Sequence, residues 1–181
     1  MPEVTKLPIE KIVTDIVKTI DREREQEIIA RRFGLHDRKE TLEQIGELLG
    51  ITRERVRQLE KAVVARLKAQ SDSGNMPHIA MVQDALIELL GNMGNLSRIT
   101  DLTAKLTTEN TRIDQSRISF LAQLSPKLVV IDDNDFYFQA VGLKGVRDEK
   151  DIKKLVDAII ATLKEIGAPT KIEEIAKKVG I

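Results

Sequence analysis

Cysteine and tryptophan are both absent from this sequence of 181 residues. Without cysteine the chain can form no disulfide, no thiolate metal site and no thiol nucleophile. Net charge is also lacking, because 29 basic residues balance 29 acidic ones, so charge has to be examined locally. No apolar run approaches the roughly 18 residues of a membrane helix, and the N-terminus has no signal-peptide pattern. We therefore expect a cytoplasmic protein without a membrane partner.

Catalytic motifs are missing as well. The sequence contains no glycine-rich phosphate loop, no histidine paired with a nucleophile and no isolated carboxylate pair in an apolar setting. The two histidines, His36 and His78, lie far apart and lack acidic neighbours at ligand spacing. We therefore expect no enzymatic activity, no metal, no cofactor and no small-molecule ligand.

Helical periodicity organises the first 70 residues. Apolar residues recur at helical spacing over 8–20, and a second helix is expected within 21–35. The third helix, 41–49, opens with a capping-box pattern at Thr41 and stops at a glycine. A fourth helix is expected over 53–68, where a threonine directly precedes it as a cap.

The third and fourth of these helices have the spacing of a helix-turn-helix, with Gly50 at the turn and Gly46 allowing close approach. Their expected shared core consists of Ile45, Leu49, Ile51, Val56 and Leu59. With that core facing inward, the outer side of the fourth helix carries Arg53, Glu54, Arg57, Gln58 and Lys61. Six basic and two acidic residues over 53–68 give a local charge of +4 in a neutral chain.

Such an outer face suits the major groove of DNA. Arginine can donate two hydrogen bonds to guanine, glutamine can bond adenine, and glutamate can accept from the cytosine amino group. The alternative is a solvated helix face whose i,i+4 pairs contribute about 0.2–0.5 kcal/mol each. The turn glycine, the core pattern and the local charge together favour a DNA-reading helix.

The first half of the chain also resembles a known family, region 4 of bacterial primary sigma factors. The resemblance covers roughly residues 9–68 and includes REREQEIIARRFGL at 22–35 and TLEQIGELLGITRERVRQLEKAVVARLK at 41–68. That domain reads the −35 promoter element and docks on the flap of RNA polymerase. The resemblance therefore implies double-stranded DNA and RNA polymerase as partners. Nothing resembles the sigma regions that melt the −10 element or bind the polymerase clamp, so promoter opening is not implied.

The resemblance implies roles for individual residues. Arg53, Glu54 and Gln58 match the base-reading residues of the family. Arg55 and Arg57 match arginines that lie near the DNA backbone. These five positions are the centre of the predicted DNA-binding surface.

Three further residues extend that surface. Leu42 and Glu43 match the start of the preceding helix, whose amides approach a phosphate as helix N-termini do. Lys61 is included because it shares the outer face of the fourth helix. The run Arg22 to Glu25, by contrast, is expected to be a charged helix face rather than a DNA contact.

The second half begins after 71–77, SDSGNMP, which has the composition of a linker. Three expected helices are followed by two β-rich runs, LVVI and FYFQAV, on either side of the turn-forming DDND at 132–135. This pattern predicts a winged helix-turn-helix with a small β-hairpin over 78–146. Residues 79–142 resemble the HARE-HTH winged-helix family, which includes the N-terminal domain of the RNA polymerase delta subunit.

Charge and core content give the winged module its expected properties. Residues 71–150 carry 8 basic and 11 acidic residues, and the hairpin tip is acidic, which opposes binding to phosphates. We therefore expect this module to bind a protein, and its leucines and isoleucines predict that it folds alone. Residues 147–181 look like the opening half of a further helix-turn-helix unit, with truncation at Ile181 as one interpretation.

The sequence thus predicts a mainly α protein with a sigma region 4-like helix-turn-helix domain at 1–70, a linker at 71–77 and a winged helix at 78–146. The favoured hypothesis is a sequence-specific DNA-binding transcription factor that reads a −35-like element. The alternative is an RNA polymerase-binding protein that docks on the flap in place of sigma region 4, with DNA contact secondary.

Overall fold

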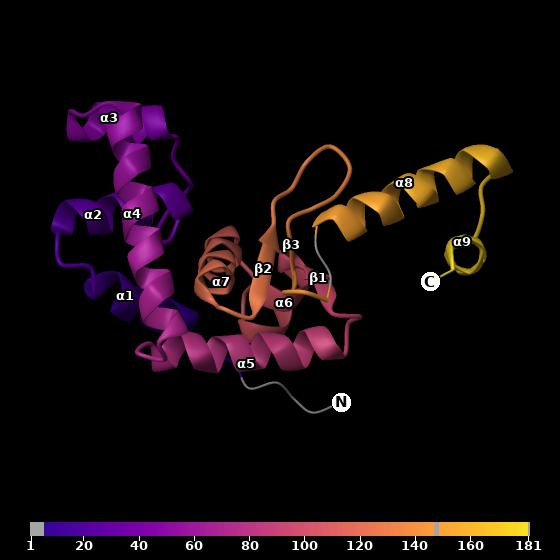
Figure 1. Ribbon diagram of the computed structural model, residues 1–181, viewed down its shortest axis with the longest axis horizontal. Coiled ribbons are helices and arrows are strands. Elements are labelled where there is room, and N and C mark those ends of the chain that lie inside the picture. The colour runs from indigo at the N-terminus through magenta and orange to yellow at the C-terminus, as the bar shows by residue number, and fades with distance from the viewer. Residues whose placement is uncertain (1–5, 147–148, 181) are drawn as a thin grey trace.

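The computed structural model describes residues 6–146 and 149–180, so the expected start of the last unit at 147–148 and Ile181 lie outside the described residues. No helix in the described ranges is long and apolar enough to cross a membrane. The elements are α1 (Ile9–Lys18), α2 (Glu23–Phe33), α3 (Leu42–Leu49), α4 (Arg53–Asp72), α5 (Pro77–Gly91), β1 (Leu96–Arg98), α6 (Ile99–Leu106), α7 (Arg112–Leu124), β2 (Leu128–Ile131), β3 (Ala140–Leu143), α8 (Glu149–Ile166) and α9 (Ile172–Val179). In the described ranges, α1 to α5 precede the three strands of a small sheet, and α8 and α9 follow it (Figure 1).

The ends of α3 and α4 are defined by local hydrogen bonds. Thr41 Oγ1 accepts from the amide of Gln44 at 3.2 Å, and Gln44 Oε1 accepts from the amide of Thr41 at 2.9 Å, so the expected capping box is confirmed. Gly50 ends α3 in the left-handed region, with φ of 63°. Thr52 then caps α4 by accepting from the amide of Arg55 at 3.2 Å. Hydrogen bonds and backbone angles within a few residues therefore define where α3 ends and α4 begins.

The second half is a winged helix, as expected. The elements follow in the order α5, β1, α6, α7, β2, β3, and the antiparallel sheet has the order β1-β3-β2. Val130 of β2 pairs with Val141 of β3, and Leu96 of β1 pairs with Gly142. The mainly helical fold class, with a helix-turn-helix and a small antiparallel sheet, is confirmed.

The wing differs from the expected hairpin. The run FYFQAV was expected to be a strand throughout, but β3 begins only at Ala140, and 132–139 form a loop. Asn134 Oδ1 accepts from the amides of Phe136 and Tyr137 at 2.8 and 3.2 Å. These bonds hold the two amides in a turn, so they are not available to a strand ladder.

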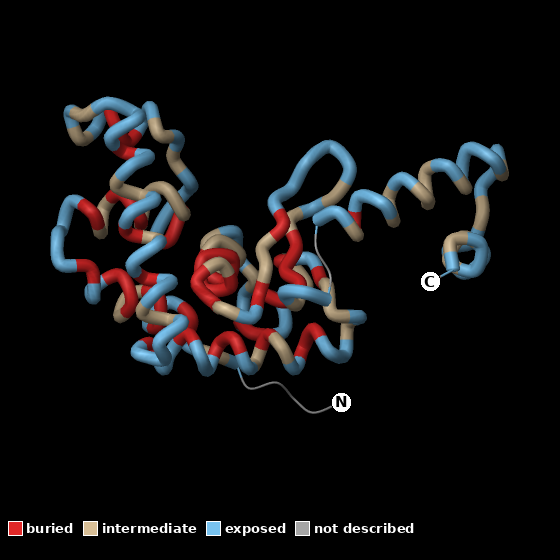
Figure 2. The backbone as a smooth tube through the Cα atoms, in the orientation of Figure 1, coloured by how far each residue is buried: buried red, intermediate tan, exposed pale blue. Residues whose placement is uncertain are grey.

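The two halves of the chain share one core. Ser71 and Asp72 complete α4, and Met76, at 7% exposure, is buried just before α5, so the expected linker is a tight connection. Buried residues continue from α1 through α4 and α5 to α7, and the backbone positions of buried residues are red in Figure 2. The rings of Phe33 and Phe120 meet across the two halves with centroids 4.9 Å apart. The expected domain boundaries stay a prediction, but the halves form one continuous body.

The last two helices stand apart from this body (Figure 1). They pack against each other, and Ile152 is the one buried residue that the described part of α8 and α9 contains. The apolar stripe of α8 is consequently only partly covered.

Candidate nucleic-acid interface

A small separate core stabilises the helix-turn-helix at the N-terminal end of α4. Ile28 of α2, Ile45 of α3 and Val56 of α4 are fully buried together. The surrounding apolar residues that pack against this trio are Leu42, Leu49, Ile51 and Leu59. Of the five predicted core positions, Ile45 and Val56 are therefore buried, and the other three are partly buried against them. The opposite side of α4 faces solvent.

Gly46 fixes how closely α3 approaches the turn that follows it. A Cβ atom built on Gly46 would lie 2.7 Å from the main-chain oxygen of Ile51 and 3.4 Å from the amide nitrogen of Arg53. Contacts this short to backbone atoms would force the turn to move. Glycine at this position therefore permits the close approach of α3 to the turn that precedes α4.

The charged run Arg22 to Glu25 has a structural role. Arg24 donates to the main-chain oxygen of Leu49 at the end of α3. Glu25 is only 8% exposed, and its carboxylate lies 2.7 Å from Arg66 of α4. The run is thus a charged face of α2 whose side chains bind α3 and α4. The sequence indicated a charged face but gave no sign that one of its carboxylates is buried.

The predicted base-reading residues Glu54 and Gln58 share a hydrogen-bonded cluster with Arg57. Arg57 donates from Nε and Nη2 to the two carboxylate oxygens of Glu54, at 2.9 and 2.8 Å. Gln58 Nε2 donates to the same carboxylate at 3.3 Å. The bond from Arg57 is the main cause that lowers the pKa of Glu54 from 4.5 to about 2, and the pair in turn raises the pKa of Arg57. Glu54 is therefore a fixed anionic acceptor on an exposed surface.

Arg53 is held by the preceding helix instead. Its Nη1 lies 2.6 Å from Glu43 Oε1, and both side chains are more than half exposed. Arg55 donates weakly to Gln58 at 3.4 Å, while Lys61 is exposed and forms no ion pair within the described part of the chain. The predicted residues of α4 therefore all lie on one exposed surface.

Leu42 differs from the other predicted site residues. Its side chain packs against the small core and is not available to a ligand. As the first residue of α3, it offers only its main-chain amide, beside that of Glu43. That is consistent with the expected phosphate contact, which uses helix N-terminal amides rather than side chains.

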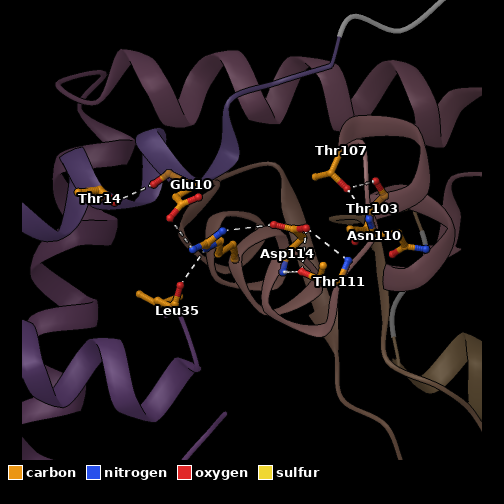
Figure 3. A network of polar contacts seen from close by, with 9 residues as sticks. Glu10, Thr14, Leu35, Thr103, Thr107, Asn110, Thr111 and Asp114 are labelled. Carbon is orange, nitrogen blue, oxygen red and sulfur yellow. Dashed lines mark hydrogen bonds and ion pairs between the residues drawn. The ribbon is translucent and has the colours of Figure 1, made fainter. Parts of the chain in front are cut away.

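The winged module has no comparable reading helix on its surface, because α7 is largely buried. Seven of its thirteen residues are buried, including Arg117. Its guanidinium pairs with Glu10 and Asp114 and donates to the main-chain oxygen of Leu35, three partners that are labelled in Figure 3. The sequence gave no local signal of this arrangement, because Gln115, Ser116 and Ser119 beside Arg117 are polar. The helix that reads DNA in many winged helices is here used for internal packing.

Comparisons with known proteins find similarity to the first half of the chain. The family described as Sigma-70, region 4 matches residues 22–69. RNA polymerase sigma factor sigB of Arabidopsis thaliana is 38% identical over 72 residues, or 38% of this chain and 13% of the relative. RNA polymerase sigma factor SigA of a Bacillus species is 43% identical over 60 residues, covering 33% of this chain and 16% of the relative.

A third relative gives the highest identity of these three. RNA polymerase principal sigma factor HrdC of Streptomyces coelicolor is 55% identical over 47 residues, which are 25% of this chain and 14% of the relative. The matches thus span about a seventh of the length of each relative. The similarity is to a single domain of these proteins, and it covers every predicted DNA-binding residue.

Proposed function

We propose that this chain is a sequence-specific DNA-binding transcription factor whose α4 reads a −35-like promoter element. The observation that carries the proposal is the exposed cluster on α4, in which Arg53, Glu54 and Gln58 project from a rigid helix-turn-helix. These groups are planar and directional, which is what readout of base edges requires. Similarity of residues 22–69 to sigma-70 region 4 supports the same conclusion.

In the proposed complex, α3 positions the unit and α4 reads the bases. The amides of Leu42 and Glu43 at the start of α3 bind a phosphate. Phosphate approach would draw Arg53 away from Glu43, because the pair is exposed and its net stabilisation is small. Arg53 then donates to a guanine, while Gln58 bonds an adenine and Glu54 accepts from a cytosine.

A second candidate function is docking on RNA polymerase in place of sigma region 4. The wing favours a protein partner, since Phe136 and Phe138 are 70% and 71% exposed beside the acidic tip at 132–135. Exposed aromatic side chains in an acidic setting suit a basic protein surface better than DNA. The likeness of 79–142 to the HARE-HTH family belongs to this candidate.

In vitro selection of bound duplex DNA, with and without core RNA polymerase, tests both candidates. The first predicts that the chain alone enriches a defined sequence, and that Arg53→Ala and Gln58→Ala each lose about 1–3 kcal/mol of preference at particular bases. Arg112→Ala, an exposed arginine on α7, is the control and keeps the preference. Enrichment that requires polymerase and survives Arg53→Ala would instead favour docking on polymerase.

A further inference from the structure

Two open grooves run between α4 and the winged module and meet at shared residues. The first is lined by α4 from Arg57 to Lys68 and by Gln123 of α7. The second continues from Lys68 and Gln123 along β2 to Lys144, directly after β3. A continuous surface therefore leads from the reading end of α4 to the edge of the sheet.

The basic residues of α4 in this groove lie on one face of the helix. Arg57, Lys61 and Lys68 are spaced i, i+4 and i+11, which at 3.6 residues per turn places them in one row. At the helical rise of 1.5 Å per residue, the row extends about 16 Å. Val63 and Leu67 are buried on the other side of α4, so the row is fixed toward the groove.

The lysines along the groove, Lys61, Lys68 and Lys144, form no ion pairs with carboxylates of the described residues. Glu60, an acid that lines the groove, is bound to Arg32 at 3.2 Å. The positive charge of the three lysines therefore remains available to a ligand.

The shared core holds the two sides of the groove in place. Because α4, α5 and α7 pack into one core, the position of Lys144 relative to Lys68 does not depend on a flexible linker. Asp132 lines the far end of the second groove and leads into the acidic tip, so a polyanion is favoured along the lysines and opposed beyond them. The basic surface is thus bounded at the end next to the wing.

We propose that Lys61, Lys68 and Lys144 form a phosphate track that guides duplex DNA from the reading end of α4 onto the edge of the winged module. This inference rests on the proposed function, since the track begins where the reading residues end. It gives the winged module a DNA contact at its edge, although its net charge is negative and its helix α7 is buried. Each neutralised phosphate releases counterions and contributes about 0.9 to the salt slope of binding.

The test compares two variants of the full chain. Lys68→Gln with Lys144→Gln removes two track charges, and Lys153→Gln with Lys154→Gln removes two exposed charges on α8 as the matched control. DNA affinity is measured over a range of salt concentrations with two forms of the selected duplex. One form is trimmed to the reading site, and the other is extended by about ten base pairs, which is one helical turn. On the extended duplex, the slope of log affinity against log salt concentration should be smaller in magnitude by about 1.8 for the track variant than for the wild type. Between 50 and 200 mM salt, the DNA affinity of the track variant should therefore fall about tenfold less than that of the wild type.

Several results would decide the matter. The track variant should behave like the wild type on the trimmed duplex, and the control variant should match the wild type on both. Equal salt slopes for track and control variants on the extended duplex would overturn the track. So would unchanged DNA binding together with weakened binding to core RNA polymerase, which would assign the lysines to an acidic protein surface.

Failure of the track is distinguishable from failure of the proposed function. If no sequence is selected, the proposed function fails, and the track is measured on mixed-sequence duplex of the extended length, where the same difference in slope is expected. If a sequence is selected and Arg53→Ala abolishes the preference while both lysine variants leave the slope unchanged, only the track is refuted.

Discussion

Arg117 Nε donates a hydrogen bond to the main-chain oxygen of Leu35 at 2.8 Å, although 82 positions separate the two residues. The same guanidinium lies 3.2 Å from Glu10 and 3.3 Å from Asp114 (Figure 3). A buried arginine is stable only when its donors are paired, and here three of its partners come from three different segments. Arg117 therefore ties the winged module to α1 and to the end of α2.

Removal of this guanidinium should destabilise the whole body. Arg117→Ala leaves the oxygen of Leu35 without its donor and is expected to lower the free energy of unfolding by about 1–3 kcal/mol. Urea denaturation followed by circular dichroism measures the change. Arg112→Ala, one turn earlier on the exposed side of α7, should change it by less than about 0.5 kcal/mol. Equal effects of the two substitutions would mean that the network contributes nothing.

The shared core also changes what is expected of fragments. From its own leucines the winged module was predicted to fold alone, but α7 is buried partly by α1 and α4. Residues 75–146 alone would expose that apolar face, so we expect cooperative thermal unfolding of residues 6–146 but not of this shorter fragment. Differential scanning calorimetry of the two fragments distinguishes these outcomes. A sharp transition in the shorter fragment would restore the original prediction.

The ion pair between the buried carboxylate of Glu25 and the exposed guanidinium of Arg66 should matter more for stability than the exposed charges beside it. Arg66→Ala removes the partner at 2.7 Å and leaves the Glu25 carboxylate only Arg22, 3.7 Å away, so about 1–3 kcal/mol of stability should be lost. Glu23→Ala, an exposed residue in the same run, serves as the control. Chemical denaturation measures both. Loss in Glu23→Ala as large as in Arg66→Ala would contradict a special role for the pair.

The close approach at Gly46 predicts a defect in both stability and DNA reading. Gly46→Ala places a Cβ against the oxygen of Ile51, and such overpacking typically costs about 1–3 kcal/mol. The turn before α4 must shift, so base preference should fall as well. Gly91→Ala is the control, because no atom lies within 4 Å of its Cβ position. A Gly46→Ala protein with unchanged melting temperature and unchanged preference would refute this reading of the turn.

Features encoded by nearby residues were predictable from the sequence. The capping box at Thr41 and the turn at Gly50 depend on hydrogen bonds and backbone angles within a few positions. The outward face of α4 follows from helical periodicity once the core residues are known. For these reasons the helix-turn-helix and its exposed reading surface were expected before the structure was known.

Features that depend on distant partners were not predictable in this way. Neither the burial of Arg117 nor the pairing of Glu25 with Arg66 has a local signal, because the partners lie 41 to 82 positions away along the chain. The segment 71–77 has the composition of a linker, yet its Met76 lies in a core to which helices as remote as α1 and α7 contribute. Composition describes the segment, whereas packing decides its role.

The pair formed by Arg57 and Glu54 has a consequence that depends on pH. The two bonds from Arg57 are the largest cause of the low pKa of Glu54, with smaller contributions from Gln58 and Arg53. A carboxyl whose pKa is lowered in the folded state stabilises that state above its ordinary pKa of 4.5. This contribution is then lost as the pH falls toward 2, because protonation of Glu54 removes the attraction to Arg57.

Arg57→Gln should therefore raise the pKa of Glu54 from about 2 part of the way to its ordinary value, as measured by ¹³C NMR titration of the side-chain carboxyl. The free energy of unfolding should also fall less steeply between pH 4.5 and 2 than it does in the wild type. Arg55→Gln is the matched control, because Arg55 bonds Gln58 rather than Glu54 and should leave that pKa low. If Glu54 still titrates near 2 in Arg57→Gln, the guanidinium does not hold the carboxylate in solution, and Arg57 is free to bind phosphate instead.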